Sequence, residues 1–159
     1  MTRCVGLAMI GLLTAWFPAS MAAQETKESG SEKERKLLLE TVGLLAVSQV
    51  YQGYLNVGLV ADAKATGAYS TQDARQILAS VQGLMEASDK NLDKVSKLEM
   101  SREDRVTLNK LRKLNSLVRR QAIILQDFWE NGNKEYSASY ERLRKEAWEG
   151  ISKMLKLDK

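Results

Sequence analysis

Four stretches of the chain repeat apolar residues at spacings of three and four, the period of an amphipathic α-helix. The expected helices are 34–65, one beginning at Ser70, one from Ser101 to Asn131, and one from about Tyr136. Because the connections are only about 2–5 residues long, neighbouring helices should run antiparallel. The pattern therefore predicts an all-α fold, an antiparallel up-down-up-down four-helix bundle over residues 34–157.

The first of these helices has the least decisive pattern. Its apolar residues in helical register are Leu38, Val42, Leu45, Tyr51, Leu55 and Leu59. A narrower polar stripe, expected to face solvent, holds Thr41, Ser48, Gln49, Gln52 and Asn56. No residue in 41–61 is charged, and a segment of that length can cross a bilayer. Because polar amides are costly in hydrocarbon, we expect the most buried helix of the bundle here, with a membrane span as the open alternative.

Two serine-initiated motifs mark helix starts, and two glycines mark helix ends. Ser70 and Asp73, like Ser101 and Asp104, have the spacing of a capping box, in which the serine and the acid satisfy exposed backbone donors. The expected breakers are Gly67 and Gly132. Two amides fall near core-facing positions of the third helix, Asn115 and Gln121.

Residues 1–23 have the features of a cleaved secretory signal peptide, with Arg3 ahead of the apolar run 5–17. The single cysteine, Cys4, precedes that run and would be removed with it, so neither a disulfide nor a lipid anchor is expected. Residues 24–33 are charged and lack large apolar side chains, which predicts a flexible mature N-terminus. We expect an exported protein, in the bacterial periplasm or secreted.

The composition argues against most catalytic chemistry. The chain has no histidine, and its glycines are scattered rather than grouped into a phosphate-binding loop. An imidazole base, a histidine metal ligand and the usual haem ligands are therefore absent. We expect no enzyme, no cofactor, no metal site and no nucleic-acid partner.

One end of the predicted bundle collects aromatic residues. There the first helix ends, the second begins, the third ends and the fourth begins. The candidate ligand or partner residues at this end are Asp62, Tyr69, Phe128, Trp129, Tyr136 and Tyr140. Aromatic side chains with polar tips suit a small-molecule pocket or a partner anchor, with Asp62 or Arg119 as the charged group. Ordinary packing of a bundle end is the alternative interpretation.

The opposite end is mildly basic, although the whole chain carries only +4. The candidate residues for contact with an anionic surface are Lys94, Lys97, Arg102, Arg105, Arg112 and Lys113. Anionic lipid headgroups or envelope polymers are the partners that such a cluster would attract. Because acidic residues intersperse with these cations, a solvated, salt-bridged face is the alternative.

In helix number, helix length and aromatic end, the predicted bundle resembles the four-helix ligand-sensing modules that bacterial receptors carry outside the membrane. It resembles, more broadly, exported bacterial helical bundles of uncharacterised function. No residue motif carries this resemblance, and the chain departs from the receptor pattern, which places a membrane helix on each side of the module. The resemblance implies a non-enzymatic module that binds a small ligand or an envelope protein. The alternatives are a structural protein held to an anionic surface by its basic end, and self-association through extra apolar positions such as Leu44 and Val47.

Overall fold

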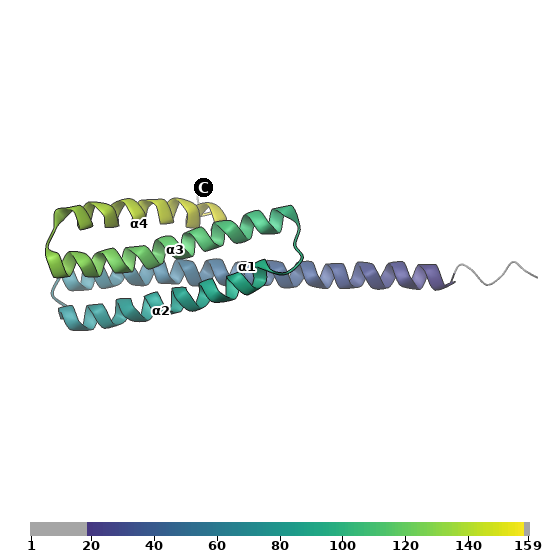
Figure 1. The fold of residues 1–159 in the computed structure, drawn as a ribbon, viewed down its shortest axis with the longest axis horizontal. Helices are drawn as coiled ribbons and strands as arrows, with labels where there is room; N and C mark the ends of the chain where they lie inside the picture. Colours follow the sequence, from purple (N-terminus) through teal and green to yellow (C-terminus); the bar gives the residue numbers. More distant parts are fainter. Residues whose placement is uncertain (1–18, 158–159) are drawn as a thin grey trace, which may run out of the picture. The chain divides into compact units, whose positions relative to one another are not determined.

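The computed structural model describes residues 19–157, and that part of the chain forms four α-helices without strands (Figure 1). The helices are α1 (Ala19–Ala65), α2 (Thr71–Ser96), α3 (Arg102–Asn131) and α4 (Lys134–Leu155). Packing divides the chain into residues 1–38 and residues 39–159. Within the second unit, successive helices run antiparallel as an up-down bundle, which confirms the predicted fold class.

Helix α1 begins well before the expected start at Glu34. It includes residues 24–33, for which we predicted a flexible segment, and begins at Ala19. Good helix formers such as Ala, Met, Gln, Glu and Lys fill this stretch, and no proline or capping box interrupts it. A single interior glycine, Gly30, costs only about 1 kcal/mol. Residues 1–18 lie outside the described part of the chain, so the signal peptide stays a prediction.

The ends of the helices follow the capping chemistry that the sequence predicted. The hydroxyl of Ser70 accepts from the Asp73 backbone N–H at 3.1 Å, and Ser101 does the same for Asp104 at 3.1 Å. Gly132 takes a left-handed conformation (φ 63°), and its N–H donates to Phe128 O at 2.8 Å. Lys156, which caps the end of α4, takes a left-handed conformation (φ 55°) although it is not a glycine. These caps fix the starts of α2 and α3 and the ends of α3 and α4.

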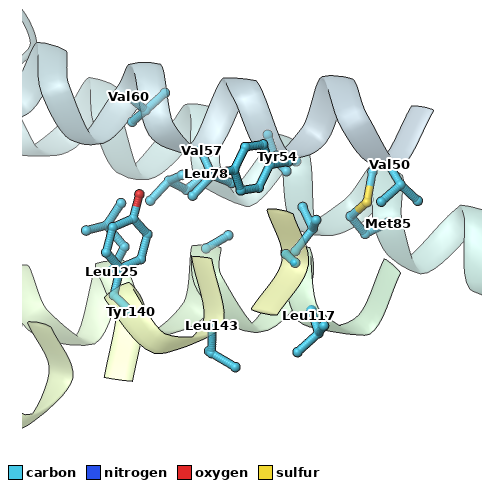
Figure 2. Packing of buried hydrophobic residues seen from close by; sticks show 14 of the residues in the cluster. Val50, Tyr54, Val57, Val60, Leu78, Met85, Leu117, Leu125, Tyr140 and Leu143 are labelled. Atoms are coloured by element: carbon cyan, nitrogen blue, oxygen red, sulfur yellow. The ribbon is translucent and has the colours of Figure 1, made fainter. Parts of the chain in front are cut away.

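The core consists of two clusters of unequal size. The large cluster fills the half of the bundle next to the α1–α2 and α3–α4 connections, and all four helices contribute to it (Figure 2). Its members include Val50, Tyr54, Val57, Leu78, Met85, Val118, Leu125, Tyr140, Leu143 and Ile151. The small cluster lies toward the α2–α3 connection and contains Ala46, Val47, Leu92, Leu108 and Leu111. Helix α4 reaches it only with its last residues, Met154 and Leu155.

The buried face of α1 is not the one that the leucine pattern predicted. The core-facing residues are Ala46, Val47, Val50, Tyr54, Val57 and Val60. Leu45 and Leu59, which we placed in the apolar stripe, are 65% and 64% exposed. The predicted apolar stripe is therefore wrong at these leucines, because apolar residues lie all around 41–61 and the spacing alone does not select a face. No helix among the described residues, α1 included, is long and apolar enough to cross a membrane.

Two amides lie inside the large half of the bundle, as predicted for α3. Asn115 donates from Nδ2 to Met85 O at 2.7 Å, and Gln121 donates from Nε2 to Leu143 O at 3.3 Å. Both side chains are fully buried, and the side-chain oxygen of each has no partner among the described residues. The first bond ties α3 to α2 and the second ties α3 to α4, so the pair fixes the relative register of three helices.

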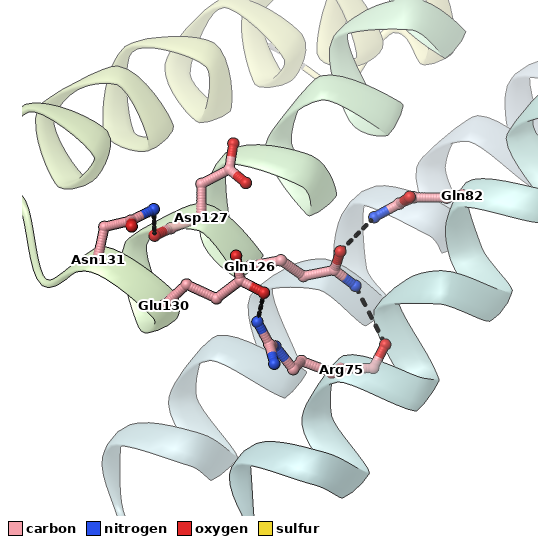
Figure 3. A network of polar contacts seen from close by, with 6 residues as sticks. All are labelled: Arg75, Gln82, Gln126, Asp127, Glu130 and Asn131. Atoms are coloured by element: carbon pink, nitrogen blue, oxygen red, sulfur yellow. Dashed lines mark hydrogen bonds and ion pairs between the residues drawn. The ribbon is translucent and has the colours of Figure 1, made fainter.

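A half-buried polar network also joins α2 to α3 (Figure 3). Gln126 accepts from Gln82 Nε2 at 3.1 Å and donates to the backbone oxygen of Arg75 at 3.1 Å. The guanidinium of Arg75 pairs with Glu130 one turn further along α3. These contacts hold the end of α3, and with it the start of the α3–α4 connection, against α2.

Candidate functional site

A hollow of about 430 Å³ opens at the aromatic end of the bundle, between α1, α3 and α4. We refer to it as the aromatic hollow. Its lining residues are Ala61, Asp62, Lys64, Ala65, Leu125, Phe128, Trp129, Ser137, Tyr140, Glu141 and Arg144. The volume is in the range of pockets that hold small organic molecules.

The structure brings four of the six predicted ligand-end residues together around this hollow. Asp62 lies on the last turns of α1, and Phe128 and Trp129 lie at the end of α3. Tyr140 comes from the second turn of α4 and is buried in the large cluster. The connection of only two residues between α3 and α4 brings their aromatic side chains to the same end of the bundle.

The other two predicted residues lie elsewhere. Tyr69 is exposed in the α1–α2 connection, and Tyr136 is half-buried in the first turn of α4. Neither lines the aromatic hollow. Arg119, which we considered as a charged partner, does not line it either.

Arg144 is the central charged residue of the hollow, and the sequence interpretation missed it. Its Nη1 donates to the Tyr140 hydroxyl at 3.3 Å, one turn earlier on α4. Its guanidinium carbon lies 4.9 Å from the ring centroid of Tyr54 on α1, a cation–π distance. Gly58 leaves room for this group, since a Cβ there would collide with the Arg144 guanidinium. The i, i+4 spacing of Tyr140 and Arg144 was the only signal available in the sequence.

The aromatic rings next to Arg144 continue the contact between α1 and α4. Tyr54 stacks on Trp148 with ring centroids 5.9 Å apart and an interplanar angle of 27°. The ring centroids of Tyr51 and Trp148 lie 6.4 Å apart. The guanidinium is thus fixed between a tyrosine hydroxyl and an aromatic stack, which reduces the entropy it would lose on binding an anion.

Burial changes the acidity of Tyr140. Desolvation raises the pKa of its hydroxyl above the ordinary value of 10.0, and the attraction and hydrogen bond of Arg144 offset only part of that rise. The hydroxyl is therefore neutral around pH 7. It accepts the Arg144 bond, which leaves its own proton available for an acceptor in the hollow.

Charges of both signs surround the aromatic rings of the hollow. Asp62 and Glu141 supply carboxylates, and Lys64 and Arg144 supply cations. Within residues 19–157, none of these four side chains takes part in an ion pair with another. The hollow can therefore offer a cation to an anionic group and a carboxylate to an amine, next to an apolar wall.

A second hollow, of about 460 Å³, lies between α3 and α4 and has a different lining. We refer to it as the lysine groove. Its lining residues are Thr107, Lys110, Lys113, Leu114, Leu117, Glu146, Gly150, Lys153 and Met154. Its only carboxylate, Glu146, pairs with Lys113 at 2.8 Å, and the hydrogen bond from Lys113 lowers the pKa of Glu146. Lys110 and Lys153 have no ion-pair partner in the described part of the chain.

Three of the six predicted basic residues take part in salt bridges, and three do not. Arg112 and Lys97 share the carboxylate of Asp93, at 3.3 and 3.4 Å. Lys113 belongs to the lysine groove. The remaining three are exposed and unpaired among the described residues: Lys94, Arg102 and Arg105. Half of the predicted cluster is thus engaged in salt bridges, as in the alternative that we left open.

Neither hollow has the ligands of a metal centre. No group of three or more acidic or sulfur side chains in residues 19–157 is arranged to hold a metal ion. No protein-family model, no characterised protein and no solved structure matches this chain. What the chain can bind is therefore inferred from the geometry of its own residues.

Proposed function

We propose that this chain is an exported, non-enzymatic binding module, and that the aromatic hollow holds a small molecule carrying a carboxylate on an apolar or aromatic body. The observation that carries the proposal is the pre-positioned guanidinium of Arg144 beside Phe128 and Trp129 in a hollow of ligand size. A fixed, partly buried cation next to an aromatic wall matches that class of ligand in charge and shape.

Each part of the hollow has a separate role in this proposal. Arg144 binds the carboxylate, and Lys64 adds a second cation. Phe128 and Trp129 cover the apolar body of the ligand, and Asp62 or Glu141 accepts from an amine where the ligand has one. Ligands that carry both an amine and a carboxylate should bind better than plain acids of the same size. Without an amine on the ligand, the carboxylates of Asp62 and Glu141 would repel the bound anion.

Native mass spectrometry of the purified chain is the first experiment. Extra mass that is lost at higher activation would show a retained small molecule. A titration with a panel of aliphatic and aromatic carboxylic acids and amino acids, followed by tryptophan fluorescence, then tests the hollow directly. The change should come from Trp129, so the Trp129→Phe variant should lose most of it although Trp148 is still present.

The variant Arg144→Gln should weaken binding of the carboxylates about 10-fold or more, since a hydrogen bond to a charged group contributes about 1.5–3 kcal/mol. Lys113→Gln, which removes a cation from the lysine groove, is the matched control and should leave binding unchanged. Absence of a response to the whole panel, or an equal loss in both variants, would refute a ligand site in the aromatic hollow.

The lysine groove supports a second candidate function, contact with an anionic surface. Its apolar floor of Leu114, Leu117 and Met154 lies below two unpaired amines, which suits the headgroup and first carbons of an anionic lipid. Binding to phosphatidylglycerol vesicles should fall steeply with salt. It should also fall in the Lys110→Gln/Lys153→Gln variant and persist in the control Lys134→Gln/Lys145→Gln. Binding that resists salt, or that both double variants lose equally, would contradict it.

A further inference from the structure

The outward face of α1 is unusually apolar for a helix in contact with solvent. Leu44, Leu45 and Leu59 are between 62% and 65% exposed, and Leu55 is 40% exposed. No Asp, Glu, Lys or Arg occurs in residues 41–61, whereas the outward faces of α2, α3 and α4 are rich in charge. Apolar surface of this kind on a soluble helix marks an interaction site.

Five exposed residues of this face follow the spacing of a coiled-coil seam. Their positions alternate in steps of three and four along α1: Leu45, Ser48, Gln52, Leu55 and Leu59. All five are exposed, so the seam is separate from the core face of α1. A 3-4 repeat is the pattern with which one helix packs its side chains between those of another. The surface therefore fits a helix better than it fits a flat or irregular partner.

We propose that this face pairs with the same face of a second copy of the chain, with the two α1 helices antiparallel. When the two-fold axis is set at the level of residue 50, Leu45 of one copy lies opposite Leu55 of the other. Ser48 then lies opposite Gln52, so that these leucines meet each other and the two polar side chains can hydrogen-bond across the axis, while Leu59 lies opposite Thr41 at the edge of the contact. A parallel arrangement would instead place each Gln52 against its own copy.

Charge also favours a second copy over the other occupants. Two chains of net charge +4 repel each other over most of their surface, and a contact through an uncharged face keeps that repulsion small. A helix that lies on an anionic membrane carries Lys and Arg beside its apolar face, but 41–61 has none. The seam is only about 21 Å long, so the contact should be small and the dimer concentration-dependent.

Sedimentation velocity of the full chain from micromolar to millimolar concentration tests the proposal. We expect a reversible monomer–dimer equilibrium. Leu45→Lys should weaken the dimer at least about tenfold, because a charge would be buried in the seam. Val106→Lys, at an exposed apolar position of α3 (47% against 65% for Leu45), is the control and should leave the equilibrium unchanged. Circular dichroism of each variant checks that the helices persist.

A charge swap tests the direction of the two helices. In the double variant Leu45→Lys/Leu55→Glu, an antiparallel dimer gains two Lys–Glu pairs and should recover most of the lost affinity. A parallel dimer would oppose lysine to lysine and glutamate to glutamate, so failure of the double variant to recover overturns the antiparallel register. A chain that stays monomeric at millimolar concentration, or that binds uncharged lipid vesicles through Leu45 without self-association, overturns the proposal as a whole.

Discussion

The two halves of the bundle are built from the same helices but are packed differently. The half with the aromatic hollow has a large cluster to which all four helices contribute. The half toward the α2–α3 connection has a small cluster from α1, α2 and α3, and α4 reaches it only with Met154 and Leu155. The difference arises from length, since α4 ends at Leu155 before it can run beside the start of α3 (Figure 1). The more extensive core packing of this bundle therefore lies in the half where its shortest helix, α4, runs beside the other three.

Truncating one core side chain in each half should give the largest difference in the free energy of unfolding between the two halves. Leu78→Ala in the large cluster should cost about 4 kcal/mol, and Leu108→Ala in the small cluster about 2 kcal/mol, because a cavity among fewer neighbours collapses more readily. Urea denaturation of both variants measures the two free energies of unfolding. Equal costs would show that the two halves are equally well packed.

Replacing a buried amide of the large half should show how much stability the amide costs in return for fixing the register of the helices. Gln121→Met keeps the volume and removes an amide oxygen that has no partner. Leu143 O would lose its bond from Gln121 but keep its helical bond, so we expect a gain of about 1 kcal/mol. Thermal unfolding of the variant checks this, and a loss of stability would mean that the amide contributes more than its desolvation costs.

The large half should also lose stability at high pH because of Tyr140. Its hydroxyl has a raised pKa in the folded chain, so the unfolded chain releases this proton first. The stabilisation from the neutral group is complete below about pH 10 and is lost as the pH rises from there toward the folded-state pKa. Tyr140→Phe should flatten this part of the stability profile. An identical slope in the variant would assign the loss to other groups.

The smallest effect should come from the exposed ion pair of the lysine groove. Glu146→Gln breaks the contact with Lys113, and exposed pairs of this kind contribute less than about 1 kcal/mol. Because this carboxylate has a lowered pKa, its contribution is present at neutral pH and is lost as the pH falls through the folded-state pKa. Chemical denaturation at pH 7 and pH 3 should show a difference only at pH 7.

The sequence predicts the fold correctly where the signal lies within one helix. Its predictions fail where the outcome depends on contacts between helices. Ser70, Ser101 and Gly132 act within one turn of chain, so their capping roles were readable from spacing. Helix α1 has two apolar faces, one of valines and one of leucines. Which of them is buried depends on its contacts with α2, α3 and α4, and those contacts bury the valines. Arg144 was missed for the same reason, because its contact with Tyr54 joins α4 to α1.

The left-handed residue at the end of α4 makes the bundle a useful scaffold for protein design. Lys156 adopts φ 55° without being a glycine, a conformation that costs an ordinary residue about 1–2 kcal/mol. A designer has two choices at this one position. Replacing the lysine with glycine would relieve the strain and keep the present length. Replacing the last residues with strong helix formers would lengthen α4 so that it covers the small cluster, which is now formed by α1, α2 and α3.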